Sequence, residues 1–501
     1  MSHMSTLSGT VPLPPRRRRR VAPAVAGAAL ALLLPLAPAS ADEPLDRSSR
    51  PGWKGSTPAV VQPRDLDRAA RVETPRAGAL PKVKSWSRPK ALVSAPNGFQ
   101  SYDIARNGKG AGIVAWTEIG RKGVRPWFRR VTARGKWSKP VRLAGWSKQV
   151  GDGGISGQVA VSLDRSGRAV VGWTAAKKVG KKWRTGVQVA TVSPRGKVAR
   201  RWITATAPPP PHLRVHTSPN GHTVVWWNGH DPKAWGHPVH FVSWKGRAGW
   251  TRLKYARDSR WMPDEGGDAS VSTSGLVTAT WVERGGSLGG RLRAVTLDSK
   301  GTVTQRVAAT ASNMIMNSTH TATDGGNVTV SYMDSWYDTS GSLKDTWYTV
   351  RRTNGVWAAP TVTPKKSPGG NTWDIDGNNS GKVAMIGLGY SAENPPEWVT
   401  VTAGIQAKPG GAWDVRGVQP RVRNEWSYFN PGVHMTANGK VLVSYRAGLN
   451  GVAWQKNGAW VRAGINRFGD FKFASDSRSR VSLLAVSKHK GWSLTLYTKK
   501  F

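Results

Sequence analysis

The chain contains no cysteine and few acidic residues. It has 501 residues, with 29 Asp and Glu against 74 Lys and Arg, which gives a formal net charge of +45. The lack of cysteine excludes disulfides, thiol catalysis and cysteine-bound metals. The excess of positive charge favours polyanionic partners such as acidic glycans and anionic cell-envelope polymers, because opposite charges attract over long range. An ordinary solvated basic surface would give the same composition. No basic helix, zinc spacing or nucleic-acid module is present, so we expect no specific nucleic-acid partner.

Long apolar runs are missing after the first 40 residues, which predicts that the rest of the chain has no membrane span. Helical hydrophobic patterns are missing there as well. Tyr and Phe are scarce, with 9 and 8 residues, whereas Trp is abundant with 26. The 57 Gly and 33 Pro residues indicate many turns. Together these features favour the all-β fold class.

The first residues have the layout of an export signal. Residues 16–20 are five arginines, residues 21–38 are rich in Ala and Leu, and Ala39-Ser40-Ala41 forms a small-x-small cleavage site. This order predicts a secretory signal peptide over residues 1–41, with the general and twin-arginine export routes both open. Residues 42–83 are rich in Pro, Arg, Ser and Ala and predict a disordered linker or arm. We expect a secreted protein that is extracellular or loosely associated with the wall.

Residues 84–501 repeat a short apolar strand that ends in an aromatic residue in most units. Clear examples are 112–116, 169–173 and 223–227, and the strand recurs at a spacing of roughly 50 residues. Each unit also contains a strand before this one and two after it. Four-stranded units at this spacing predict the blades of a β-propeller. We count eight blades, with seven as the alternative. The strand near Trp86 is expected to complete the last blade and so to close the ring.

One phrase of the repeat resembles secreted bacterial propellers of the sialidase-like (BNR) kind. Asp164-Arg165-Ser166-Gly167-Arg168 runs directly into the strand Val170-Val171-Gly172-Trp173. The resemblance covers about residues 84–501 and implies the propeller fold. The chain departs from the family because two residues instead of one separate Asp164 from Gly167. The three arginines of true sialidases also have no counterpart that can be placed here. Sialidase activity is therefore not implied.

Trp residues fall into a repeating group and a non-repeating group. Trp116, Trp173, Trp227 and Trp281 end equivalent strands, and a second series recurs near the start of the outermost strand, so we expect both to pack between blades. The non-repeating aromatic residues lie in connections expected at one face of the ring, where they suit stacking on sugars or packing of their own loops. They are Trp146, Trp235, Trp261, Trp336, Trp373, Trp426 and Tyr337.

The innermost strand of the units is expected to carry polar residues around the central axis. Asp103, Asp268 and Asp374 are the candidate catalytic carboxyls, since paired carboxyls perform glycoside chemistry. The other candidate ligand-binding residues are His212, His216, His320, His434, Asp264 and Asp376. A solvent-filled polar channel, a saccharide site and an active site remain open as interpretations. His237 and His240 match no recognised metal motif, so we expect no metal or cofactor.

These patterns favour a non-catalytic, lectin-like propeller that recognises glycan or an anionic cell-envelope polymer through its Trp-rich loop face. The first alternative is a glycan-cleaving hydrolase or lyase that uses the carboxyls of the inner strands. The second alternative is a protein–protein scaffold in an envelope assembly. Enzymatic activity therefore stays open, although the balance of features is against it.

Overall fold

The computed structural model describes residues 86–501 with several gaps. The gaps are residues 88–89, 148–156, 180, 207–211, 231–237, 247–248, 255–261, 286–288, 312–313, 338–342, 364–371, 391–397, 424–430, 448, 457–458, 465–467 and 489–491. The described part consists of strands and turns and contains no helix. Accordingly, none of the described residues belongs to a helix that could cross a membrane.

The described strands form eight antiparallel sheets, and each sheet is named here by its innermost strand. The β2 sheet contains β2 (Phe99–Arg106), β3 (Gly112–Gly120), β4 (Gly123–Val131) and β5 (Val141–Arg142). The β6 sheet contains β6 (Val159–Leu163), β7 (Ala169–Val179), β8 (Lys182–Val192) and β9 (Val198–Thr206). The β10 sheet contains β10 (Leu213–Thr217), β11 (Thr223–His230), β12 (Pro238–Gly246) and β13 (Gly249–Lys254). The β14 sheet contains β14 (Met262–Val271), β15 (Val277–Arg284), β16 (Gly290–Leu297) and β17 (Val303–Ala311).

The remaining four sheets follow the same plan. The β18 sheet contains β18 (Met314–Ala322), β19 (Val328–Tyr337), β20 (Leu343–Thr353) and two short outer strands, β21 (Val356–Trp357) and β22 (Thr361–Val362). The β23 sheet contains β23 (Thr372–Gly377), β24 (Val383–Tyr390), β25 (Trp398–Gln406) and β26 (Trp413–Arg423). The β27 sheet contains β27 (Gly432–Met435), β28 (Val441–Ala447), β29 (Leu449–Lys456) and β30 (Ala459–Gly464). The β31 sheet contains β31 (Phe468–Ser475), β32 (Arg480–Lys488), β33 (Trp492–Lys500) and β1 (Lys90–Ala95).

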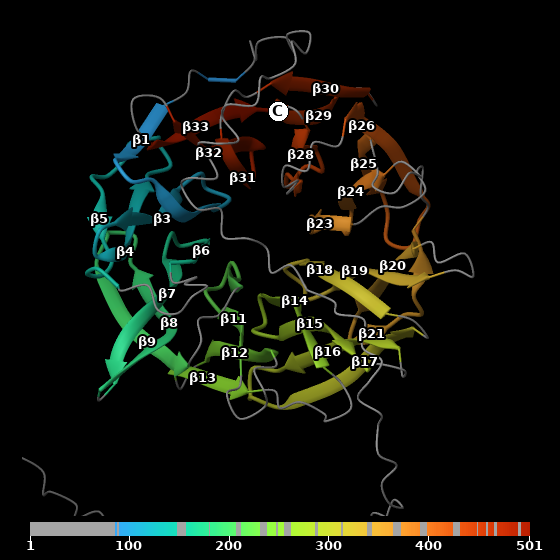
Figure 1. Ribbon diagram of the computed structural model, residues 1–501, viewed down its shortest axis with the longest axis horizontal. Helices are drawn as coiled ribbons and strands as arrows, with labels where there is room; N and C mark the ends of the chain where they lie inside the picture. Colours follow the sequence, from blue (N-terminus) through green and yellow to red (C-terminus); the bar gives the residue numbers. More distant parts are fainter. Residues whose placement is uncertain are drawn as a thin grey trace, which may run out of the picture. The chain divides into compact units, whose positions relative to one another are not determined.

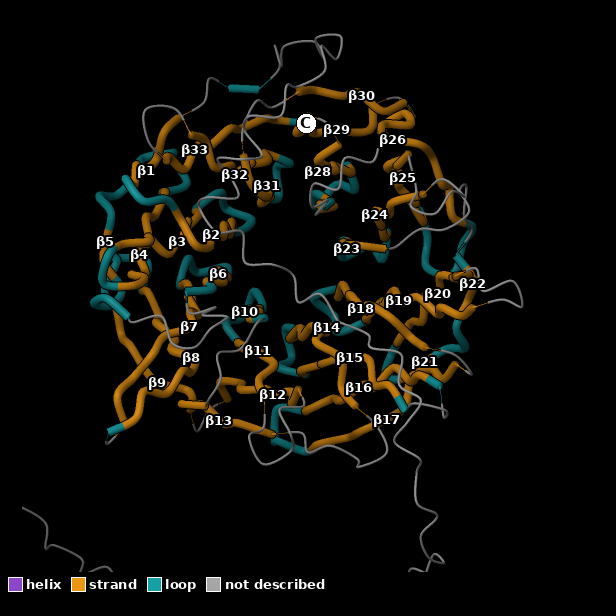
Figure 2. The backbone as a smooth tube through the Cα atoms, in the orientation of Figure 1, coloured by secondary structure: helices purple, strands orange, loops and turns teal. Residues whose placement is uncertain are grey.

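The sheets stand radially around one axis, with their first strands innermost (Figures 1 and 2). Each innermost strand contacts the innermost strands of the two neighbouring sheets, and β31 contacts β2, so the contacts run around a closed ring. The ring closes through β1, which pairs with β33 as the outer strand of the β31 sheet. The predicted all-β propeller of four-stranded blades is therefore confirmed. The eight sheets equal the number of repeats counted in the sequence.

We call one end of the sheets the turn face. There the first strand turns tightly into the second. The third strand leads into the fourth in every sheet except the β31 sheet, whose fourth strand, β1, comes from the start of the described chain. The other end, where the second strand turns into the third and the chain passes to the next sheet, is called the loop face. We call the turn between the first and second strands of a sheet its inner turn. The first residue of each inner turn donates its N–H to the carbonyl of the fifth residue, as Asp164 does to Arg168 at 2.9 Å. The fourth residue adopts positive φ and is glycine everywhere except at Ser479, where φ is 57°.

The core lies between neighbouring sheets. Trp116, Trp173, Trp227 and Trp281 are at most 2% exposed, which places them between sheets as their repeated position predicts. The Trp residues of the outer series pack in or against hydrophobic clusters between the sheets. Trp86 is buried, and Trp202 and Trp250 are half-buried. The series consists of Trp86, Trp137, Trp202, Trp250, Trp357, Trp413 and Trp460. Apolar surface buried on both faces of each sheet thus stabilises the ring, since a lone four-stranded sheet buries too little.

Candidate functional site

Five charged residues occupy the same level on different innermost strands. Each lies four residues before the first residue of its inner turn, and each pairs with the equivalent position of the second strand. They are Asp103 on β2, Arg214 on β10, Asp268 on β14, Asp374 on β23 and Lys472 on β31. We call this set the charged layer. It gathers side chains from distant parts of the propeller sequence, residues 103 to 472, around one axis.

Two carboxylates of the charged layer join neighbouring sheets. Asp103 Oδ1 accepts the N–H of Ile104 at 2.9 Å, and Oδ2 accepts the N–H of Val161 on the next innermost strand at 2.9 Å. Asp374 repeats this with Ile375 at 3.0 Å and Val433 at 3.1 Å. Burial raises the pKa of Asp103, and it raises the pKa of Asp374 to about 6. These carboxyls therefore have a structural role whatever else they do.

The same inter-sheet link recurs two residues closer to the turn. The N–H of Thr217 donates to Ser162 Oγ at 2.9 Å. The N–H of Val271 donates to His216 Nδ1 at 3.1 Å. The N–H of Met435 donates to Asp376 Oδ2 at 2.8 Å. Burial lowers the pKa of His216, which keeps its ring neutral so that Nδ1 can accept. Polar residues on the innermost strands thus supply hydrogen bonds that a radial stack of sheets cannot form through its own strand pairing.

His434 is held from both sides. Its Nδ1 lies 3.0 Å from Asp376 Oδ2, its Nε2 lies 2.9 Å from Ser475 Oγ, and its ring stacks on Phe473 with centroids 5.9 Å apart. His212 comes immediately before β10 and is half-buried. His434 and Asp376 therefore form a fixed pair that bridges three neighbouring sheets.

His320 lies differently from the expected position facing the axis. It is 5% exposed, and its Nδ1 lies 2.8 Å from Thr280 Oγ1 in the preceding sheet. Successive side chains of a strand point to opposite faces of the sheet. Asp103, His216 and Asp374 stand an even number of residues before their inner turns, whereas His320 stands an odd number before its own. His320 therefore points to the other face of its sheet. Burial also lowers the pKa of His320, which leaves the ring neutral between the sheets.

Three members of the charged layer keep free polar atoms. Asp268 Oδ1 accepts the N–H of Ala269 at 2.7 Å, but Oδ2 accepts no hydrogen bond from the described chain. The side chains of Arg214, which is exposed, and Lys472, which is half-buried, likewise form no hydrogen bond or ion pair with any described residue. The positive charges of both offset part of the rise in the pKa of Asp103 and Asp374. The level therefore offers two free cations and one free carboxylate oxygen.

Sequence reasoning missed Arg214 and Lys472. The sequence pattern drew attention to Asp and His on the innermost strands, whereas bases are common throughout this chain and do not stand out. The signal was present, since both residues stand at the same distance from their turns as Asp103, Asp268 and Asp374. An alignment of the repeats on the fourth residue of each inner turn, which is glycine or Ser479, would have found them.

The loop face of the β2 sheet carries an aromatic stack. The guanidinium carbon of Arg125 lies 4.7 Å from the ring centroid of Trp127 and 4.2 Å from that of Trp146. Glu118 Oε2 accepts hydrogen bonds from Arg125 Nη2 and Trp127 Nε1, both at 2.9 Å. Any side chain at Gly120 would collide with the Trp146 ring, so that ring rests on bare backbone. Trp146 is thus a rigid platform that remains 36% exposed.

A pocket of about 140 Å³ adjoins this platform between the β2 and β6 sheets. Trp146 and Ser147 line one side, and Trp173 and Gln188 line the other. Trp173 Nε1 is a buried donor without a partner among the described residues, and the Gln188 carboxamide makes no hydrogen bond to them. The volume is below the roughly 300–1,000 Å³ of pockets that enclose a whole ligand. It therefore suits one ring of a longer molecule.

The other predicted residues are tested only in part. Trp235, Trp261, Trp426 and His237 lie outside the described residues. Trp336 and Tyr337 lie at the end of β19, whereas Trp373 lies in β23, Asp264 in β14 and His240 in β12. Their roles stay predictions. Within the described ranges, no group of three or more His, Asp or Glu side chains is placed so that it could hold a metal ion.

Known proteins give a likeness in fold. No protein-family model and no curated protein matches the chain. A polysaccharide lyase described as a PL25 ulvan lyase is 11% identical over 76% of this chain and 96% of its own, with a TM-score of 0.46. The β-propeller domain of the Trilobed protease from Pyrococcus furiosus is 12% identical over 68% and 97%, with a TM-score of 0.38. The leech intramolecular trans-sialidase is 12% identical over 72% and 67%, with a TM-score of 0.35.

At sequence identities this low, what is shared is the arrangement of the strands, and no activity transfers to this chain. The chain is a β-propeller whose function has to follow from its own side chains.

Proposed function

We propose that the protein is an exported, non-catalytic propeller that binds saccharide at its loop face. The observation that carries the proposal is the Trp146 platform beside the pocket, because an exposed and immobilised indole suits the apolar face of a sugar ring. The carboxamide of Gln188, which lines the pocket and makes no hydrogen bond to the described chain, can supply hydrogen bonds for hydroxyl groups. Export rests on the arginine run, apolar stretch and cleavage site of residues 16–41.

The charged layer favours an acidic saccharide over a neutral one. Arg214 and Lys472 have no partner in the described chain, so an anionic group can pair with them without displacing an existing ion pair. The net charge, which is +45 for the full sequence and 45 − 5 = +40 once residues 1–41 with their five arginines are removed, draws such a ligand toward the protein from a distance. The partner class is therefore a glycan or envelope polymer that carries negative charge.

Catalysis is the second candidate, and it depends on Asp268. Glycoside cleavage needs two available carboxyl groups. Asp103 and Asp374 each use both oxygens to accept backbone N–H groups, which leaves Asp268 with the free oxygen of the three. A single free carboxylate favours binding over hydrolysis. Turnover of any polysaccharide that is lost in Asp268→Asn would establish the enzyme instead.

The binding proposal is tested by an array of neutral oligosaccharides, acidic oligosaccharides and cell-wall fragments. We expect wild-type protein to retain acidic saccharides and Trp146→Ala to lose about fivefold to tenfold in affinity, since a stacked aromatic contact contributes about 1–1.4 kcal/mol. Trp357→Ala is the matched control, because Trp357 is half-buried at the opposite, turn face. The melting temperature of both variants is measured alongside. Equal retention by wild type and Trp146→Ala would refute the site. Retention of a stoichiometric protein without any glycan signal would favour the scaffold alternative.

A further inference from the structure

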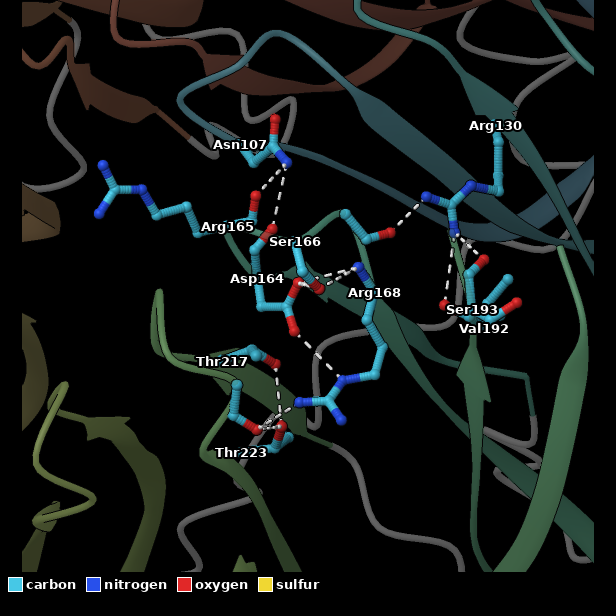
Figure 3. A network of polar contacts seen from close by, with 12 residues as sticks. Asn107, Arg130, Asp164, Arg165, Ser166, Arg168, Val192, Ser193, Thr217 and Thr223 are labelled. Atoms are coloured by element: carbon cyan, nitrogen blue, oxygen red, sulfur yellow. Dashed lines mark hydrogen bonds and ion pairs between the residues drawn. The ribbon is translucent and has the colours of Figure 1, made fainter. Parts of the chain in front are cut away.

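Hydrogen bonds join the inner turns of neighbouring sheets on the turn face at seven of the eight junctions, and among the described residues only the junction between the β27 and β31 sheets lacks one. Asn107 Nδ2 donates to the carbonyl of Asp164 at 3.1 Å (Figure 3). The N–H of Arg165 donates to the carbonyl of Pro219 at 3.1 Å. Ser477 Oγ donates to the carbonyl of Gly108, which links the last sheet to the first at 2.5 Å. Turns that are fixed to their neighbours display their outer side chains at constant spacing, so this face is a rigid scaffold.

Exposed cations cluster on one part of this scaffold. Ten Lys and Arg residues stand on the turn-face ends of four consecutive sheets, and all of them are exposed. No side chain among them makes a hydrogen bond or ion pair with any described residue. We call this set the basic arc. In order around the ring, its members are Lys440, Lys456, Arg478, Lys500, Lys109, Arg134, Lys136, Arg165, Arg195 and Lys197.

Acidic residues of the same turns do not neutralise the basic arc. Asp164 and Asp476 are each 2% exposed. Their carboxylates bind Arg168 and Arg480, both with N–O distances of 3.1 Å, and cap their own turns. Repulsion between cations is evident at the edge of the arc, where burial and the charge of Lys440 lower the pKa of Lys382. The positive charge of the arc is therefore directed outward.

We propose that the basic arc binds a linear phosphate polymer, at a surface separate from the saccharide site of the loop face. A row of cations on a curved belt matches a chain that carries one negative charge per repeat, because each contact releases a condensed counterion. The turns at 107–111, 132–136, 164–168, 193–197, 436–440 and 476–480 contain no aromatic residue on which a base could stack. Two half-buried aromatic residues, Trp137 and Phe501, adjoin the arc next to Lys136 and Lys500. With most of its cations away from any aromatic ring, the arc favours a polymer without bases.

The proposal is tested with long-chain inorganic polyphosphate as the probe. The test variant replaces Arg134, Lys136, Arg195 and Lys197 by Gln. These residues lie in the outer hairpins of the β2 and β6 sheets, and their side chains have no intramolecular partner to lose. The control variant replaces Arg121, Lys122, Lys178 and Lys181 by Gln. Those residues are equally exposed on the same two sheets, but they lie in the hairpins of the loop face. Both variants change the net charge by the same amount.

We expect wild type and the control variant to bind polyphosphate with the same steep dependence on salt. In the test variant, the slope of log K against log salt becomes shallower by about one for each cation that contacts phosphate. An equal loss in both variants would overturn the proposal, because net charge alone would then explain binding. Tighter binding of single-stranded DNA than of polyphosphate, or binding of anionic phospholipid vesicles alone, would also overturn it in favour of those partners.

Discussion

The carboxylates of the innermost strands combine two properties that normally conflict. They are removed from water, which raises the pKa of Asp103 and Asp374, yet they accept backbone N–H groups, which favour the charged form. Burial prevails at both residues. These carboxylates join neighbouring sheets through hydrogen bonds. Keeping them charged while they are buried lowers the stability of the folded protein at neutral pH.

Asp374 makes stability depend on pH in a defined direction. Its pKa is about 6 in the folded protein and ordinarily 3.8, so the folded state binds more protons than the unfolded state between these values. Stability from this group is complete below about pH 4 and falls by up to about 3 kcal/mol as the pH rises through 6. Urea unfolding at pH 4.5 and pH 7 measures the fall. We expect Asp374→Asn to reduce it.

Asp298→Asn is the control for this pH dependence. A hydrogen bond from the Thr302 N–H lowers the pKa of this exposed carboxyl, so its removal leaves the fall between pH 4.5 and pH 7 unchanged. The account of Asp374 fails if Asp374→Asn and wild type lose the same stability over that range.

Ser479 is the residue that departs from the turn pattern. It has a φ of 57°, it is 2% exposed, and its buried Oγ has no partner in the described chain, whereas the equivalent residues are glycine. Ser479→Gly relieves the left-handed conformation and removes the unpaired hydroxyl. We expect it to raise the free energy of unfolding by about 1 kcal/mol. The reverse change at the equivalent turn, Gly439→Ser, should lower stability, and a loss of stability in Ser479→Gly would contradict this view.

At the residue scale, the sequence predicted which side chains lie on the innermost strands better than it predicted what those side chains do. The structure places Asp and His residues on these strands, as predicted. Their use as inter-sheet acceptors depends on whether a residue stands at an odd or even distance from its turn, which separates His320 from His216. The role of Trp146 depends on Arg125 and Gly120, which lie more than twenty residues earlier in the chain and approach it only in the folded sheet.

The strand that closes the ring is the element on which the whole propeller depends. β1 pairs with β33 and connects the start of the described chain with its end. Leu92 of β1 is 4% exposed and packs with Ile104, Trp116 and Leu494. Loss of this contact loosens the joint between the first and last sheets, because no other strand links β33 to the chain's beginning within the described ranges.

Leu92→Ala should therefore destabilise the ring by about 2–4 kcal/mol, as expected for a buried leucine. Thermal or urea unfolding followed by tryptophan fluorescence measures this. Val303→Ala provides the comparison, because Val303 lies on the outer strand β17 and is 38% exposed, so a change within about 0.5 kcal/mol is expected. Equal effects of the two substitutions would show that β1 is no more than a peripheral strand.

The strands and turns could be predicted from the sequence more completely than the roles of single side chains. The apolar strands, the glycine of seven of the eight inner turns and the closing strand near Trp86 all carry local signals, and the structure places them as expected. Short outer strands such as β5 and β21 were less predictable, since each has two residues and owes its place to the strand beside it.

The propeller as a whole presents two unlike faces. The loop face carries the aromatic platform and the pocket, whereas the turn face carries the basic arc. The sequence predicted the contrast in loops, because non-repeating aromatic residues fall in one set of connections. It did not predict the basic arc, since its members are far apart in the chain and become neighbours through the circular order of the sheets.

Hydrogen–deuterium exchange of the full chain tests this division most directly. The protein is labelled alone, with the acidic oligosaccharide that the array retains best, and with polyphosphate. The account predicts that the oligosaccharide protects peptides covering 117–126 and 143–147, and that polyphosphate protects those covering 132–136 and 193–197. Protection of the same peptides by both ligands, or protection by the oligosaccharide at the turn face alone, would contradict it.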